Sequence, residues 1–277
     1  MTEATFTLDE LGRLRALVDS LGDTLDPSIL IGGWATWMRI GGDAFFSHDI
    51  DLIINSVSLR STLRDTLQDY SESHHRGGMK ARGTIDGIHV DAYIPYESEL
   101  GDRLRLKVDV LAQHVDEIPM RKWLLLNIEA HTISKMAALL DRFDKEKGAK
   151  DAREVMALLF PDEQRKLAPP DAAYAVRILF DATAGPAADV PAHVARVFEL
   201  LPQVATMNKK RRRELDVLAK AWVNEAKDQL AARQRPQAGP TFITQPRRAS
   251  LATPGSSRRA NDPTATSPSS RTGLDGR

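Results

Sequence analysis

The chain has 277 residues, of which 42% are hydrophobic, with 38 basic and 38 acidic side chains and no cysteine. This length suffices for one large domain or two small ones with a buried core. The lack of cysteine excludes a disulfide framework, a thiolate zinc site and a cysteine nucleophile. No apolar run approaches about eighteen residues, so no membrane span is predicted. The acidic, helix-patterned N-terminus does not have the form of a signal peptide, and a cytoplasmic protein is expected.

The zero net charge is the sum of two unlike parts. Residues 233–277 contain eight arginines and two aspartates, so residues 1–232 carry a net charge of −6 that balances the tail. Nearly half of the tail consists of Ser, Thr, Pro or Gly. Such a composition buries too little apolar surface to offset the entropy lost on ordering. We therefore predict a disordered basic tail behind a mildly acidic body.

The first part of the chain alternates helix and strand patterns. Thr7–Glu10 has the form of a capping box and opens a predicted helix to about Leu21. Residues 28–31 have the pattern of a buried strand that ends in a tight turn at Gly32-Gly33. A short helix is then predicted over residues 34–40.

The next segment predicts a central strand and a hairpin. Residues 48–54 alternate and then become fully apolar, as in a strand at the centre of a sheet. Ser58 is expected to cap a polar helix that continues to Tyr70, followed by a glycine-containing loop over residues 71–78. Residues 79–95 predict two strands joined by a two-residue turn at Asp86-Gly87.

These patterns together predict the α/β (α+β) fold class. Residues 1–118 are expected to form the mixed domain, and residues 119–232 a mainly helical one. Residues 123–128 are compatible with a further strand or with the start of a helix. From Thr132 onward helical periodicity dominates. Further helices are predicted over residues 171–183, 190–201 and 208–232.

Two of the predicted strands carry carboxylates where strand interiors normally have apolar residues. Asp49 and Asp51 are two apart in one strand and therefore project to the same face, and Asp91 lies in the second. Adjacent carboxylates are costly unless a cation lies between them, and ligation by oxygen alone favours Mg²⁺ or Mn²⁺. The Gly32-Gly33 pair would bring backbone N–H groups near an anion. Each feature alone is more often a solvated strand end or a simple turn, but their combination indicates metal-dependent phosphate chemistry.

Two sequence blocks resemble a known superfamily. Gly32-Gly33, a short helix, Ser47-His48-Asp49-Ile50-Asp51-Leu52 and a later strand Asp resemble the nucleotidyltransferases with the DNA-polymerase-β-like fold. The second block, Ser134–Arg142 followed by Lys150–Val155, resembles the signature of the AbiEii family of toxin nucleotidyltransferases, which includes the MenT toxins. The resemblance spans about residues 28–160. It implies a polymerase-β-like domain whose active site is completed by the helical domain.

Three features depart from the family pattern. Phe45-Phe46 occupies the place where the family often has an Arg two residues before the Ser, and the spacing from Gly33 to Asp49 is slightly long. Glu154 stands where the family tends to have a second Asp. These departures concern the choice of substrate more than the chemistry.

The resemblance implies transfer of a nucleoside monophosphate from an NTP, with release of pyrophosphate. Asp49 and Asp51 would hold Mg²⁺ or Mn²⁺ against the triphosphate. Asp91 would either ligate the metal or accept the proton of the attacking hydroxyl. Gly32-Gly33 and Ser47 would contact phosphate oxygens.

The second block contains the positively charged side chain that the resemblance implies for the triphosphate. Lys135 would neutralise triphosphate charge, and Arg142 and Asp151 would support the site from the helical segment. Lys135 and Arg142 are seven residues apart, so they share one helical face, which is also typical of a solvated stripe.

The implied acceptor is the 3′ end of tRNA, because toxins of this family extend it and so block aminoacylation and translation. A cognate antitoxin is then a further partner, and a monomer is expected. Lys209–Arg213 are five consecutive cations that suit either an RNA backbone or a solvated helix start, and their unfavourable position in the helix dipole favours a function. Two alternatives remain open: nucleotidylation of a small molecule or protein, and a catalytically idle nucleotide-binding protein.

Overall fold

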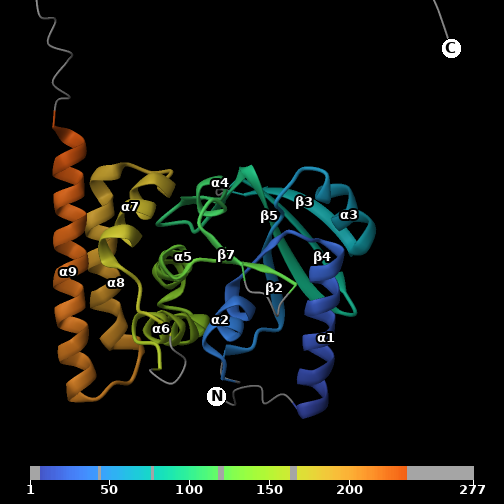
Figure 1. Cartoon of the computed structure of the whole chain (residues 1–277), viewed down its shortest axis with the longest axis horizontal. Helices are drawn as coiled ribbons and strands as arrows, with labels where there is room; N and C mark the ends of the chain where they lie inside the picture. Colours follow the sequence, from blue (N-terminus) through green and yellow to red (C-terminus); the bar gives the residue numbers. More distant parts are fainter. Residues whose placement is uncertain (1–6, 43–44, 76–77, 118–121, 163–166, 236–277) are drawn as a thin grey trace, which may run out of the picture. The chain divides into compact units, whose positions relative to one another are not determined.

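A computed structural model describes residues 7–42, 45–75, 78–117, 122–162 and 167–235 (Figure 1). The described residues belong to one compact unit that ends at Arg235. They form a mixed sheet covered by helices, which confirms the predicted α+β class. No helix within these described ranges is both long enough and apolar enough to cross a membrane.

Among the described residues the sheet has eight strands, and the predicted site strands lie at its centre. The main path runs β3-β4-β5-β2-β1-β8-β7, with β6 paired to β5. Strand β2 pairs in parallel with β5 and antiparallel with β1, and β8 pairs in parallel with β1. The strands are β1 (Ile29–Ile31), β2 (Asp49–Ile53), β3 (Gln68–His75), β4 (Gly78–Ile85), β5 (Ile88–Leu100), β6 (Leu106–Lys107), β7 (Val115–Glu117) and β8 (Leu124–Leu126).

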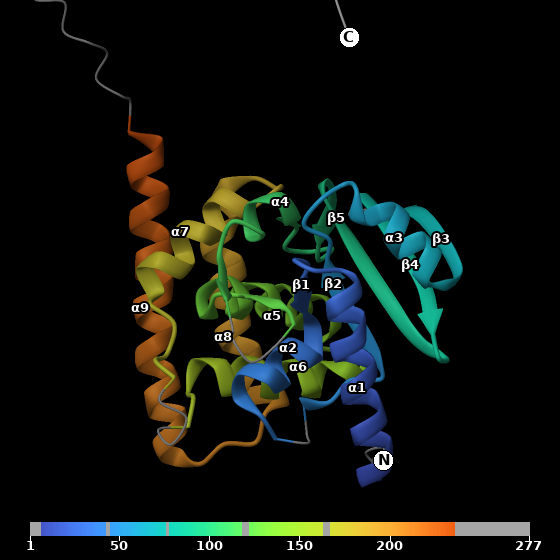
Figure 2. The same cartoon turned by 45° about the vertical axis from the view of Figure 1, so that its right-hand side comes forward.

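Helices cover both faces of this sheet. Figure 1 shows α1 on one side and α5–α9 on the other, and Figure 2 shows α1 in front of β1 and β2. The helices are α1 (Leu8–Thr24), α2 (Gly32–Ile40), α3 (Leu59–Thr66), α4 (Val108–Leu111), α5 (Ile128–Arg142), α6 (Glu146–Leu159), α7 (Ala172–Ala182), α8 (Val190–Val204) and α9 (Lys209–Gln234), with a 3₁₀ turn at Ala187–Asp189.

Strand alternation divides the core into two main clusters. Ile50 and Leu52 of β2 point towards α1, where they pack with its buried leucines. Ile53 belongs to the cluster that includes α5 and the C-terminal helices. Successive side chains of a strand point to opposite faces, so Asp49 and Asp51 share the face of Ile53. The pattern of β2 therefore turns both carboxylates towards α5 and α6.

Several predicted elements are confirmed, beginning with the capping box. The backbone N–H of Glu10 donates to the Thr7 hydroxyl, and Glu10 accepts from the backbone N–H of Thr7. The strands at 28–31 and 48–54 and the hairpin at Asp86-Gly87 are present. The sequence of residues 123–128 is compatible with a strand or with the start of a helix, and the segment forms both, strand β8 and then the start of α5.

One prediction in this half of the chain is wrong. The helix after Ser58 ends at Thr66, and residues 68–75 form β3 instead of the end of a helix and a loop. Residues 68–75 pair antiparallel with β4, a contact between segments that local periodicity does not report. The Ser58 side chain also makes no capping hydrogen bond to the helix.

The proposed division into domains stays a prediction. Strand β8, assigned from the sequence to the helical part, pairs with β1 inside the sheet, so the sheet draws on both parts of the chain. The boundary after residue 118 lies outside the described residues. The tail is predicted to begin at residue 233, but α9 continues to Gln234; from residue 236 onward the tail lies outside the described residues.

Candidate active site

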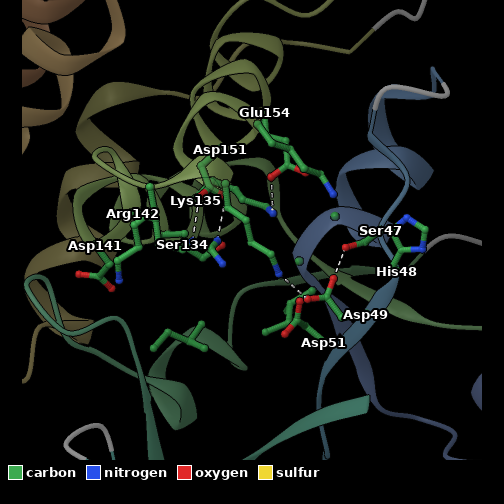
Figure 3. Close-up of a pocket in the computed structure, with 18 of the residues that line it drawn as sticks. Ser47, His48, Asp49, Asp51, Ser134, Lys135, Asp141, Arg142, Asp151 and Glu154 are labelled. Carbon is green, nitrogen blue, oxygen red and sulfur yellow. Dashed lines mark hydrogen bonds and ion pairs between the residues drawn. The ribbon is translucent and has the colours of Figure 1, made fainter. Parts of the chain in front are cut away.

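A cavity of about 1010 Å³ opens where β1 and β2 meet α2, α5 and α6. Eight of the nine residues that the sequence marks as site residues line it. They are Gly32, Gly33, Ser47, Asp49, Asp51, Lys135, Arg142 and Asp151. Figure 3 shows the carboxylates of β2 facing the side chains of α5 and α6 across this space.

The two glycines form the first turn of α2 rather than a separate turn before it, which corrects the prediction. Gly32 has a φ of +71°, and a Cβ atom at this position would lie 2.3 Å from Oδ2 of Asp51. A Cβ on Gly33 would lie 3.0 Å from Nζ of Lys150 and from Cβ of Ser47. Only glycine allows this conformation and this approach. The backbone N–H groups of a helix start attract anions, so the glycines leave that helix end accessible beside the carboxylates.

Asp49 is held in its ionised form by two donors. The Ser47 hydroxyl donates to Oδ1, and Nζ of Lys147 lies 3.1 Å from Oδ2. Burial alone would raise the pKa of Asp49, but the Ser47 hydrogen bond and the charge of Lys147 lower it to about 2. Ser47, expected at phosphate oxygens, therefore bonds to Asp49 in this structure.

Asp51 lies deeper and has the opposite electrostatic environment. Burial, with the nearby charges of Asp49 and Asp91, raises the pKa of Asp51 to about 6. The register of β2 and β5 places Asp51 opposite Asp91. The three carboxylates thus come from two neighbouring strands.

Asp91 is already paired with cations from β4. It forms ion pairs with Lys80 and with Arg82, whose Nε lies 3.1 Å from Oδ1. Asp91 does not line the cavity. Within the described part of the chain no group of three or more His, Asp or Glu side chains is arranged to hold a metal ion. The roles proposed for Asp91, as a ligand or a proton acceptor, stay predictions.

Lys135 is buried against a carboxylate that the sequence did not mark as a site residue. Its Nζ lies 2.5 Å from Oε2 of Glu154, and the two side chains are only 7% and 1% exposed. Beyond this ion pair, neither Glu154 oxygen has a hydrogen-bond partner among the described residues. The side chain predicted to neutralise the triphosphate, Lys135, is thus paired with α6 in this structure.

Arg142 and Asp151 form the most regular polar contact of the cavity. Nε and Nη2 of Arg142 each donate to one carboxylate oxygen of Asp151, both at 2.8 Å. Such a bidentate pair fixes both side chains. Burial raises the pKa of Asp151, although the charge of Arg142 opposes that shift. The pair links the end of α5 to the middle of α6.

Helix α6 adds two further cations, to which no site role was assigned from the sequence. Lys147 pairs with Asp49, and Lys150 donates to the backbone carbonyl of Phe46 at 2.9 Å. Burial lowers the pKa of Lys150. Residues 147, 150, 151 and 154 recur at helical spacing, so they share one face of α6. That periodicity is the signal by which the sequence would have marked them.

A buried histidine lies one helical turn before Lys135. Nε2 of His131 is 3.2 Å from the Thr36 hydroxyl, while Nδ1 has no hydrogen-bond partner in the described structure. Burial and the charges of Arg39 and Lys135 lower the pKa of His131 well below 6.5. The folded protein therefore holds His131 neutral.

This burial predicts a pH dependence of stability. Below about pH 6.5 His131 is protonated in the unfolded chain but stays neutral in the folded chain. The free energy of unfolding therefore falls by about 1.4 kcal/mol for each pH unit of acidification, until the pH reaches the pKa of His131 in the folded protein. His131→Gln is expected to remove that slope. Urea denaturation of both proteins at about pH 7 and about pH 5 measures it. An equal change in the free energy of unfolding for both proteins would contradict a neutral buried His131.

No family model and no curated protein matches this sequence. Several solved structures are similar to it. JHP933 from Helicobacter pylori has 17% identity and a TM-score of 0.42, over 83% of this chain and 100% of that chain. An antigenic nucleotidyltransferase-like protein from Paracoccidioides brasiliensis has 16% identity and a TM-score of 0.33, over 56% of this chain and 80% of that one. The antibiotic-resistance factor ANT(2″)-Ia has 17% identity and a TM-score of 0.37, over 56% and 88%. These structural likenesses are distant.

Proposed function

We propose that this protein is a Mg²⁺-dependent nucleotidyltransferase that transfers a nucleoside monophosphate from an NTP to an acceptor hydroxyl. One observation carries the proposal. A single cavity contains a glycine-permitted helix start, two neighbouring carboxylates and a facing group of cations. These are the groups that hold a triphosphate and offset the charge that develops during its cleavage.

Positively charged side chains line the part of the cavity where the triphosphate would bind. Lys135, Arg142 and Lys150 line the cavity opposite β2, and the start of α2 presents backbone N–H groups beside them. Cations and helix starts both stabilise phosphate oxygens. Lys135 is the best placed to neutralise the leaving pyrophosphate, by exchanging Glu154 for phosphate oxygens.

The carboxylates fit a hard divalent cation. Burial beside Asp49 raises the pKa of Asp51 to about 6, and a bound cation would relieve that cost. Asp49 and Asp51 would therefore hold Mg²⁺ or Mn²⁺, since their donor atoms are carboxylate oxygens. A cation held there would supply positive charge that stabilises the phosphate oxygens during the displacement. Ser47 orients Asp49, and Asp91 either adds a ligand or accepts the hydroxyl proton.

The acceptor that we propose is the 3′ end of tRNA, with the protein acting as the toxin of a toxin–antitoxin system and an antitoxin as its partner. The support is the resemblance of the two sequence blocks to AbiEii-type toxins. The cations Lys209–Arg213 at the start of α9 also suit an RNA backbone. A toxin that extends tRNA blocks aminoacylation and hence translation.

Incubation with each labelled NTP, Mg²⁺ and total tRNA tests this proposal. We expect label in the RNA, and its loss in Lys135→Ala, because that variant removes the charge at the leaving group. Parallel reactions with an aminoglycoside and with a protein acceptor separate the acceptor classes. Label in either of these, with none in RNA, would support small-molecule or protein nucleotidylation instead. Label in RNA that persists in Asp49→Ala would overturn the assigned chemistry.

A further inference from the structure

A second cavity, of about 460 Å³, lies between the C-terminal half of α6 and the segment that joins α8 to α9. Apolar residues from the end of α6 and from the connecting segment line it together with polar ones, which are two arginines, a threonine and an asparagine. Arg153, Phe160, Met207, Asn208 and Arg211 are among the residues that line it. The mixture suits a ligand with a flat apolar part and a negative charge.

An arginine and an aromatic ring are stacked at this cavity. The guanidinium carbon of Arg211 lies 4.3 Å from the centre of the Phe160 ring. Nη1 of Arg211 also lies 3.0 Å from Glu214, which holds the arginine in place. Aromatic rings and guanidinium planes are the surfaces on which unpaired bases stack.

The basic cluster Lys209–Arg213 adjoins the same cavity. Lys209, Arg212 and Arg213 are exposed, and Glu214 pairs with Lys210 and Arg211. Cations in the first turn of a helix oppose its dipole and so lower the stability of α9. The backbone N–H groups at the start of α9 and the cations of the cluster both attract negative charge. Their combination favours a polyanionic ligand.

Arg153 connects this surface to the candidate active site. It projects from α6 and lines both the first and the second cavity. The second cavity also borders the start of α9, where Arg211 contacts the Phe160 ring at the end of α6. A chain of nucleotides with its end in the first cavity can therefore pass Arg153 and reach the second cavity.

We propose that the second cavity and the basic cluster bind the nucleotides that precede the 3′ end of a single-stranded RNA acceptor. One base stacks at Phe160 and Arg211, and the cations of the cluster contact the phosphates. This inference rests on the proposed function for the position of the 3′ end. A duplex fits less well, because its paired bases are not free to stack on a side chain.

Binding of a fluorescein-labelled single-stranded RNA of about twelve nucleotides, measured by anisotropy without NTP, tests the surface. Lys209→Glu/Lys210→Glu is expected to weaken binding at least tenfold and to reduce the slope of log K against log salt by about 1 to 2. Lys220→Glu/Lys227→Glu reverses two exposed charges farther along the same helix and is the matched control, with an expected change within about twofold. Phe160→Leu is expected to weaken binding about fivefold without changing the salt slope.

Three results would overturn the RNA-binding surface: equal weakening by the two charge reversals, unchanged binding by Phe160→Leu, or equally strong competition by a duplex of the same length. In the transfer reaction, Lys209→Glu/Lys210→Glu should raise the KM for RNA about tenfold and leave the KM for NTP unchanged. Transfer to RNA with no change in either KM would overturn this surface alone. RNA binding with the expected dependence but no transfer by the wild-type protein would overturn the proposed function and not the surface.

Discussion

Asp51→Asn is expected to lower the rate of nucleotide transfer about a thousandfold. The substitution keeps the shape of the side chain but removes a negative charge at the proposed metal site. Metal-based charge stabilisation supplies several kcal/mol to such reactions, and each 1.4 kcal/mol changes a rate tenfold. Single-turnover transfer of a labelled nucleotide measures the effect.

The same variant should remain folded. Burial beside Asp49 raises the pKa of Asp51 to about 6, so its ionised form costs stability near neutral pH and asparagine removes that cost. Thermal unfolding should therefore show an equal or higher Tm. Asp86→Asn is the matched control, because Asp86 lies in an exposed hairpin turn with a φ of +49° that asparagine tolerates. Full transfer activity of Asp51→Asn would remove Asp51 from the metal site.

Glu154→Leu is expected to lower the free energy of unfolding by about 3 kcal/mol. It leaves the charge of Lys135 buried without its partner, and breaking a buried ion pair on one side costs about 3–5 kcal/mol. The lower end applies because Lys135 lines a cavity. Urea denaturation of the wild type and variant measures the difference.

The double variant Lys135→Met/Glu154→Leu distinguishes this cause from a general packing defect. Replacing both charges by apolar groups is often neutral, so we expect the double variant to recover most of the lost stability. Glu199→Leu is the control, since Glu199 is exposed and its ion pair with Arg196 is worth less than about 1 kcal/mol. A double variant as unstable as Glu154→Leu would show that the charge of Lys135 is not the cause.

The Lys135–Glu154 pair also gives a physical reason for one departure from the family pattern. A glutamate is one methylene longer than the aspartate that the family tends to have, and from α6 it reaches Nζ of Lys135 at 2.5 Å. Under the proposed function, nucleotide binding would move Lys135 from Glu154 to the phosphate oxygens.

Local patterns predicted the strands of the site well. The alternation in residues 48–54 sends Asp49 and Asp51 to one face and Ile50 and Leu52 to the other, because side chains in a strand alternate strictly. The capping box at Thr7–Glu10 and the hairpin turn at Asp86-Gly87 are equally local. Local patterns gave the wrong prediction at residues 68–75, which form β3 because their backbone pairs with β4.

The sequence by itself determined the α+β class, the placement of two carboxylates on one strand face and the glycine pair before them, since each depends on neighbours within a few residues. Only the tertiary structure decided the partners of these groups. It placed Lys147 on Asp49, Glu154 on Lys135, and Lys80 and Arg82 on Asp91. These contacts join residues from different elements, and their distances follow from how helices and strands pack, which no periodicity along the chain records.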